Sequence, residues 1–267
     1  MTNSMSVISR EFNAVAAIIG RELIRVIRNP VYIAISIIFP IIFIGILGGS
    51  MSQNLAGNVG YNFMQFMLIG MIVNSMFQSS VSGMSQLVEE RSSNFTQELF
   101  VSPISRYSIV LGKMIGTAFS SMVMLIGIIV VALVLQIPLG GMSFVWLLLL
   151  SPLFSLVGAA LGIFFISFIT DSKVADIGSM LITMPQMFLS GALIPVNHST
   201  GILSFLAHIM PMTYCVDLAR AVFYWGDPIY NEIVLFNPAL DLIVIVCFIL
   251  IFSVIGTILF ARSEKNR

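Results

Sequence analysis

The sequence predicts an all-α integral membrane protein with six membrane-spanning helices. Of its 267 residues, 58% are hydrophobic and only 9% are charged, whereas about a quarter of the residues of a soluble domain are charged. Apolar segments of about 20 residues, the length that crosses a bilayer, recur along the chain. They lie near residues 31–50, 62–85, 108–136, 144–170, 174–194 and 239–261, in a single transmembrane domain over 1–267.

The basic residues predict the orientation of these spans. With six spans, all but one of the 12 Lys and Arg residues fall on one side, and only Arg220 falls on the other. Because basic loops stay in the cytoplasm, we expect a multi-pass protein of the cell (plasma or inner) membrane with both termini cytoplasmic. The formal net charge of zero gives no indication of a nucleic-acid partner.

Residues 7–28 predict an amphipathic helix before the first span. Arg10, Arg21, Arg25 and Arg28 share one face, and six apolar residues share the other: Ile8, Phe12, Val15, Ile19, Leu23 and Val26. Such a helix suits the membrane surface. It either anchors the topology or also contacts a cytoplasmic partner, and the pattern does not choose between the two.

The cytoplasmic loop near 86–107 mixes charged residues with Phe95, Leu99 and Phe100. Phe95 and Leu99 are four residues apart, so a short helix over 88–105 would show an apolar edge. Apolar residues in a polar loop favour docking onto another protein, although the edge could instead pack on the bundle.

The external segment 195–238 is about 40 residues long, more than a plain connector needs. It is apolar enough to resemble a seventh span, but Pro211 and Gly226-Asp227-Pro228 break it. We expect two short re-entrant helices at the outer leaflet, because irregular backbone at depth must be buried in protein. Asp217 and Arg220, three residues apart, are expected to pair.

The second span carries a polar stripe. Asn74, Ser75, Gln78, Ser79 and Ser82 fall on one helix face. Polar residues inside a membrane line a water-filled path or bond to neighbouring helices, and both readings remain open.

Recognisable catalytic chemistry is absent. The chain has no phosphate-binding loop, no paired-histidine metal pattern and no G-x-S-x-G, so we predict no catalytic and no metal site. Ionisable residues are nearly absent from the predicted spans; Asp176 and Asp241 lie close to their ends. Uphill transport would therefore need a partner as its energy source.

Two stretches resemble the permease subunits of ABC-2 type exporters. One runs from Glu89-Glu90-Arg91 through Glu98-Leu99-Phe100-Val101-Ser102-Pro103 to Leu111-Gly112-Lys113, and the other from Pro185 through Leu189-Ser190-Gly191-Ala192-Leu193-Ile194-Pro195 to Asp217-Leu218-Ala219-Arg220. The resemblance covers nearly the whole chain. It implies a second permease subunit, identical or homologous, and a separate cytoplasmic ATPase that binds ATP and Mg, with no cofactor on this chain.

The resemblance also implies residue roles. The ATPase would contact a coupling helix whose residues are Glu89, Glu90, Arg91, Phe95, Glu98, Leu99, Phe100 and Pro103. A translocation path would pass Asn74, Gln78 and Ser82. An external gate would include Pro195, Pro211, Tyr214, Asp217 and Arg220. The cargo would be a drug, lipid or lipid-linked glycan, with drug and lipid exporters the nearest in sequence and multidrug efflux the expected process.

Other classes are not excluded by the residues. A membrane-embedded lipid-modifying enzyme would need paired acidic groups, for which only Asp171 and Asp176 near Lys173 are available. A non-transporting scaffold is the third reading. A secondary transporter is disfavoured, because no inverted repeat is detectable.

Overall fold

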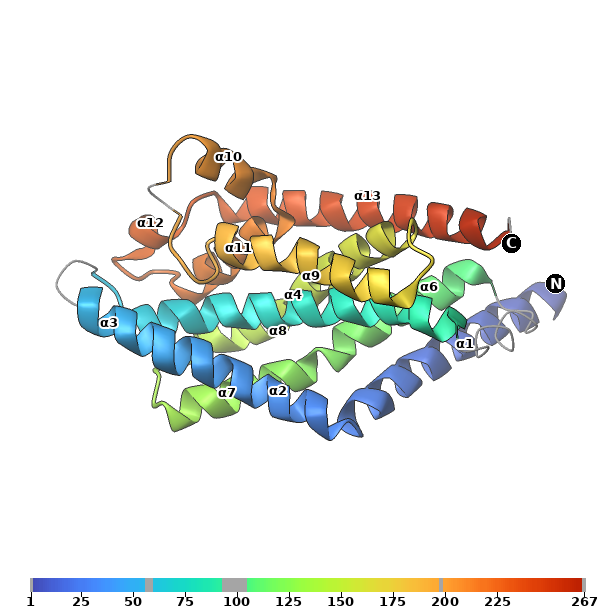
Figure 1. Ribbon diagram of the computed structural model, residues 1–267, viewed down its shortest axis with the longest axis horizontal. Helices are drawn as coiled ribbons and strands as arrows, with labels where there is room; N and C mark the ends of the chain where they lie inside the picture. Colours follow the sequence, from blue (N-terminus) through green and yellow to red (C-terminus); the bar gives the residue numbers. More distant parts are fainter. Residues whose placement is uncertain (1, 56–59, 93–104, 197–198, 266–267) are drawn as a thin grey trace.

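The computed structural model describes residues 2–55, 60–92, 105–196 and 199–265, and within these ranges the ordered elements are all helices. Most run along one long axis (Figure 1). They are α1 (Thr2–Ile27), α2 (Pro30–Pro40), the π-helix η1 (Ile41–Gly48), α3 (Gly49–Leu55), α4 (Phe63–Ser92), α6 (Arg106–Ser120), α7 (Met122–Val134), α8 (Met142–Ile166), α9 (Ser172–Leu189), α10 (Ile202–Ile209), α11 (Pro211–Phe223), α12 (Tyr230–Ile233) and α13 (Pro238–Lys265).

Four described stretches are long and apolar enough to cross a membrane: Pro30–Asn54, Arg106–Val134, Met142–Ile166 and Pro238–Ser263. Helices α10 and α11, bent by 82° at their junction, would together make a fifth, as a broken span or a re-entrant loop. The prediction of a multi-pass, all-helical protein is thus supported. Helices α4 and α9 coincide with two further predicted spans, but the count of six and the re-entrant path stay predictions.

Helix α4 is the centre of the bundle. Its side chains from Phe63 to Val88 are mostly buried, and it contacts α6, α7, α8, α9 and α11. Its closest neighbour is α8, where a Cβ at Gly162 would lie 2.9 Å from Met84 Cβ and one at Gly158 would clash with the backbone of Phe77. This pair of glycines therefore permits close helix packing, as its small-xxx-small spacing predicts.

The first span begins where the sequence predicts. Asn29 caps α2 by accepting hydrogen bonds from the backbone N–H groups of Val31 and Tyr32, both at 3.1 Å, and Pro30 is the first helical residue. Beyond Pro40 the helix changes to π geometry, as expected where proline removes a donor from the ladder. Pro152 and Pro185 lie inside α8 and α9, which continue through them.

Helix α1 forms as predicted but packs on protein rather than only on a membrane surface. It lies along α6, where a Cβ at Gly112 would be 3.2 Å from Ile18 Cβ and one at Gly116 3.0 Å from Glu22 Cγ. The sequence did not predict this contact with α6. Phe12 is 72% exposed, whereas Glu22 is fully buried, because the glycines of α6 leave room for a larger side chain.

Candidate functional site

Helix α1 contacts both ends of the loop that joins α4 to α6. At the α4 end, Nη2 of Arg21 donates to the two carboxylate oxygens of Glu90 at 2.9 and 3.0 Å. At the α6 end, the backbone N–H of Ser105 donates to the carboxylate of Glu11, 3.1 Å from each oxygen. The ends of the loop are thus bonded to one helix, about three turns apart along it.

A charge cluster of Arg21, Glu22, Arg25, Glu90 and Lys113 joins α1, α4 and α6. Nζ of Lys113 donates to Oε1 of Glu22 at 2.7 Å and to Oε1 of Glu90 at 2.8 Å. Arg25 pairs with the same carboxylates, at 2.7 Å from Glu22 and 3.3 Å from Glu90. The side chains of Lys113 and Glu22 are fully buried, so each charge depends on its partners instead of water.

The electrostatics of Glu90 follow from this cluster. Burial would raise the pKa of its carboxyl group, but the positive charges of Lys113 and Arg21 outweigh it, so the pKa lies below its ordinary value. Glu90 therefore stays ionised at neutral pH. Removing one member of a buried pair costs about 3–5 kcal/mol, because the remaining charge loses its compensation.

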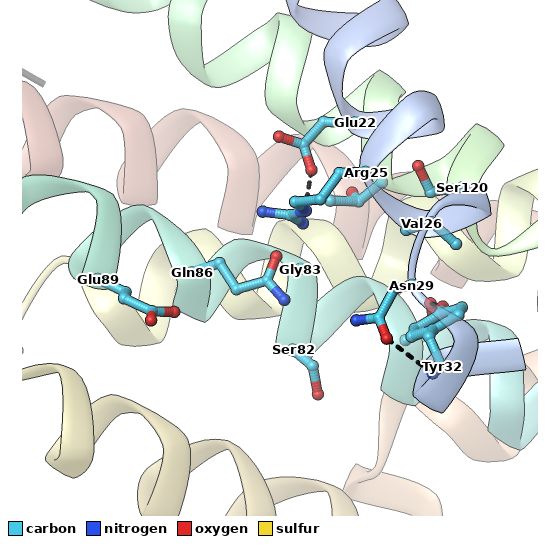
Figure 2. Close-up of a pocket in the computed structure, with 12 residues that line it drawn as sticks. Glu22, Arg25, Val26, Asn29, Tyr32, Ser82, Gly83, Gln86, Glu89 and Ser120 are labelled. Atoms are coloured by element: carbon cyan, nitrogen blue, oxygen red, sulfur yellow. Dashed lines mark hydrogen bonds and ion pairs between the residues drawn. The ribbon is translucent and has the colours of Figure 1, made fainter. Parts of the chain in front are cut away.

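A pocket of about 170 Å³ lies beside the cluster (Figure 2). It is lined by Glu22, Arg25, Val26, Asn29, Tyr32, Ser79, Ser82, Gly83, Gln86, Glu89, Thr117 and Ser120. We call it the joint pocket, because it lies where α1 ends and α2 begins. Of the predicted path residues, Ser82 lines it, whereas Asn74 is buried elsewhere in α4 and Gln78 is half-buried.

The opposite end of the molecule is closed by a cap, which comprises residues 190–196 and α10–α12 (Figure 1). Asp217 accepts hydrogen bonds from the backbone N–H groups of Leu235 and Phe236, both at 2.7 Å. Arg220 donates to the carbonyl oxygen of Gly191 at 2.7 Å, and its guanidinium carbon lies 3.5 Å from the centre of the Phe66 ring. The predicted Asp217–Arg220 ion pair is therefore wrong: both charges bond to backbone groups instead.

The other predicted gate residues also belong to the cap. The hydroxyl of Tyr214 donates to the carbonyl oxygen of His208 at 2.7 Å, and its ring stacks on Phe236 at 5.4 Å. Pro211 opens α11 directly after the bend, and half-buried Pro195 ends the turn that Arg220 contacts. The structure thus brings the five predicted gate residues into one region.

A family profile described as ABC-2 type transporter matches residues 13–224. The chain belongs to the ABC-2 type transporter family. Two relatives are named as the transport permease ycf38: that of Cyanophora paradoxa is 23% identical, covering 93% of this chain and 88% of the relative, and that of Porphyra purpurea is 25% identical, covering 95% and 89%. Nodulation protein J of Rhizobium meliloti (strain 1021) is 24% identical, covering 72% and 73%.

In this ABC-2 family chain, the predicted coupling helix over 88–105 is only partly visible. Residues 88–92 continue α4 instead of starting a new helix, and Ser105 caps α6. Phe95, Glu98, Leu99, Phe100 and Pro103 lie outside the described residues, as does the side chain of Arg91. Glu89 is exposed at the joint pocket, whereas Glu90 faces the charge cluster.

Sequence reasoning missed Glu11 and Glu22, and it counted Lys113 as a loop residue. The structure places Lys113 in the second turn of α6, fully buried, and Asp217, Arg220 and Asp241 are buried too. The expectation that the predicted spans nearly lack ionisable residues therefore missed Lys113, which lies inside the predicted span 108–136. Two sequence features could have indicated these buried charges. Lys113 lies between Gly112 and Gly116 in an apolar stretch, and Glu22 lies between Arg21 and Arg25 of the predicted amphipathic helix.

Asp171 and Asp176 are the acidic pair that the enzyme hypothesis would require, but Asp171 has a structural role in this chain. Asp171 caps α9 by accepting from the backbone N–H groups of Lys173 and Val174 at 2.9 and 3.1 Å. Asp176 is exposed one turn further along. This geometry is that of an ordinary helix start.

Proposed function

We propose that this chain is the membrane subunit of an ATP-binding cassette exporter. With a second permease subunit, identical or homologous, it would form the path for a hydrophobic or amphipathic substrate such as a drug, a lipid or a lipid-linked glycan. A separate cytoplasmic ATPase, which holds ATP and Mg, would supply the energy. The observation that carries this proposal is that α1 is bonded to both ends of the loop between α4 and α6.

The bonds on α1 give a route for force. A partner that pushes on residues 93–104 displaces Glu90 and Ser105, and both are bonded to α1. Lys113 connects the same cluster to α6. Since α1 leads into α2 through Asn29, a displacement of the loop would tilt the first span together with α6.

We further propose six spans with both termini in the cytoplasm of the cell membrane. Support comes from Figure 1, where the start of α1 and the end of α13 lie at the same end of the molecule as the end of α4. The cap lies at the other end, which would then face outwards. Helices α4 and α9 would supply the two spans beyond the four long apolar stretches.

In this proposal the substrate passes along α4 and leaves at the cap. Asn74 and Gln78 lie on α4 beyond the joint pocket, and the amide nitrogen of Asn74 is buried without a hydrogen-bond partner. An unsatisfied donor inside a bundle is costly, and a passing polar group would satisfy it. Opening the exit would require breaking the backbone bonds that hold Asp217 and Arg220.

The test is co-purification with a candidate ABC ATPase from the same organism. Wild type should retain the ATPase and stimulate ATP hydrolysis, whereas Phe95→Asp with Leu99→Asp should stay folded and lose both. Phe168→Asp is the matched control, because it places the same charge at a phenylalanine that is 63% exposed in the loop that joins α8 and α9. Wild type that purifies without the ATPase under every condition would contradict the proposal and favour a scaffold.

A further inference from the structure

Asp241 is a buried carboxylate at the end of the molecule that the cap closes. It lies in the first turn of α13, its side chain is fully buried, and neither carboxylate oxygen accepts a hydrogen bond from a described residue. The first backbone N–H groups of α13 are already bonded elsewhere: Ala239 donates to the side-chain oxygen of Asn237 at 2.9 Å, and Leu240 donates to its carbonyl oxygen at 2.8 Å. An ionised carboxylate without water or donors is too costly to bury, so the charge of Asp241 must be compensated in another way.

A second carboxylate faces Asp241. Asp217 lies on α11, which packs against α13, and the two carboxyl groups are within hydrogen-bonding reach of each other. Arg220 acts on Asp217 but not on Asp241, and its guanidinium bonds to Gly191 and lies over the ring of Phe66. One positive charge therefore stands against two carboxylates in a buried site, where two like charges that face each other cannot both stay ionised.

The other groups near the two aspartates supply no positive charge. Tyr214 and Cys215 of α11 and Tyr230 of α12 lie near Asp241, and such side chains are neutral at pH 7. Helix α8 also packs on α13 but has no ionisable residue. Helix α6 meets the opposite end of α13, where Arg106 bonds to its backbone. A proton on one of the two carboxyl groups is what would balance the site.

We propose that Asp217 and Asp241 bind one proton between them and that this proton fastens the cap to α13. Asp217 accepts two backbone hydrogen bonds at 2.7 Å, which favour its ionised form. The proton therefore resides on Asp241, whose hydroxyl group donates to Asp217. When the cap leaves α13 and water enters, both carboxyl groups ionise and the proton is released. That this proton exchanges with the outside of the cell rests on the proposed orientation, but the site itself does not.

The test compares wild type with Asp241→Asn, because an amide has the shape of the carboxylic acid and keeps an N–H donor for Asp217 at every pH. Folding of wild type takes up one proton near neutral pH, since aspartate in the unfolded chain is ionised above about pH 4. The unfolding constant of wild type relative to that of Asp241→Asn should therefore rise about ten-fold per pH unit from about pH 5.5 to 7.5. Equilibrium unfolding of the purified full chain in mixed micelles measures both constants, and Asp241→Asn should be the more stable protein at the upper end of this range.

Asp227→Asn is the matched control, because Asp227 is an exposed carboxylate between α11 and α12. Its unfolding constant relative to wild type should not change over the same pH range. Infrared spectroscopy gives a second readout that does not depend on a variant that folds. At pH 7 wild type should show the band of a protonated carboxylic acid, which should disappear as the pH is raised and be absent from Asp241→Asn.

A ratio of unfolding constants for wild type and Asp241→Asn that is independent of pH would overturn the proposal, as would a wild type without the protonated-acid band at pH 7. A ratio that depends on Na⁺ concentration at constant ionic strength would mean that a metal cation bridges the carboxylates, and it would overturn the proposal as well. Neither measurement contains an ATPase, so the failure of this proposal and the failure of the exporter proposal are separate results.

Discussion

The two ends of the molecule both bury charged side chains, but they satisfy these charges in different ways. At the α1 end, five side chains from three helices pair with one another, and Glu22 and Glu90 each have three basic partners. In the cap, Asp217 and Arg220 bond to backbone groups of loops. Side chains that share several partners can exchange them as helices shift, whereas a backbone bond fixes one loop conformation. If the chain works as proposed, the first end can move while its charges stay paired, and the second stays closed until its bonds break.

The largest effect should come from Lys113→Met. The substitution leaves two carboxylates with fewer compensating charges in a buried site, and it should lower the free energy of unfolding by about 3 kcal/mol. Lys113→Met with Glu22→Leu should recover at least half of this loss, since Glu90 keeps Arg21 and Arg25 as partners. Unfolding of the purified chain in detergent measures the coupling as a double-mutant cycle.

Lys173→Met provides the control for that cycle, because Lys173 is exposed and its loss should change stability little. The result to look for against this is a double variant whose loss in the free energy of unfolding equals the sum of the losses of the two single variants. The charges would then not act as a cluster, and the α1 end would not differ from the cap in this respect.

Asp217→Asn should cost about 2 kcal/mol, because one of two charge-assisted bonds to backbone N–H groups is lost. Both hydrogen-bond donors are backbone groups, and Asp241 is a carboxylate that also faces Asp217. Asp227→Asn is the matched control: Asp227 is exposed and accepts one backbone bond at 3.1 Å. Thermal unfolding compares the two, and an equal loss from both would show that the cap does not depend on Asp217.

Local patterns predict one part of this structure and long-range contacts decide the rest. Asn29-Pro30 is a helix start that two adjacent residues specify, and the break before Pro211 is another. The Glu22–Lys113 bond joins residues 91 positions apart, so no local period encodes it. The three-residue spacing of Asp217 and Arg220 suggested a pair, but α11 directs one toward the 235–236 turn and the other toward Phe66 of α4.

The contact between Glu11 and Ser105 should have a smaller and more local effect. Glu11→Ala removes a carboxylate from the first backbone N–H at the start of α6, where a negative charge stabilises a helix by about 1 kcal/mol or less. Hydrogen exchange should accelerate at residues 105–109 and stay unchanged in α8. Asn13→Ala, at an exposed position of α1, should leave exchange as in wild type. Faster exchange in both variants would mean that Ser105 does not depend on Glu11.

A final prediction concerns the pH dependence of the charge cluster. Because the pKa of Glu90 in the folded protein lies below its ordinary value, its pairing stabilises the fold above about pH 4.5 and is lost as pH falls through the lowered value. Wild type should therefore be more stable than Glu90→Gln at pH 7, and the difference should shrink as the pH is lowered below about 4.5. Unfolding temperatures of the two proteins from pH 7 to pH 3 measure this, with Glu232→Gln, at an exposed carboxylate of the cap, as the reference for a remote charge. A difference that grew toward low pH would require Glu90 to be protonated in the folded state, which would exclude it from the ion pairs that join α4 to α1.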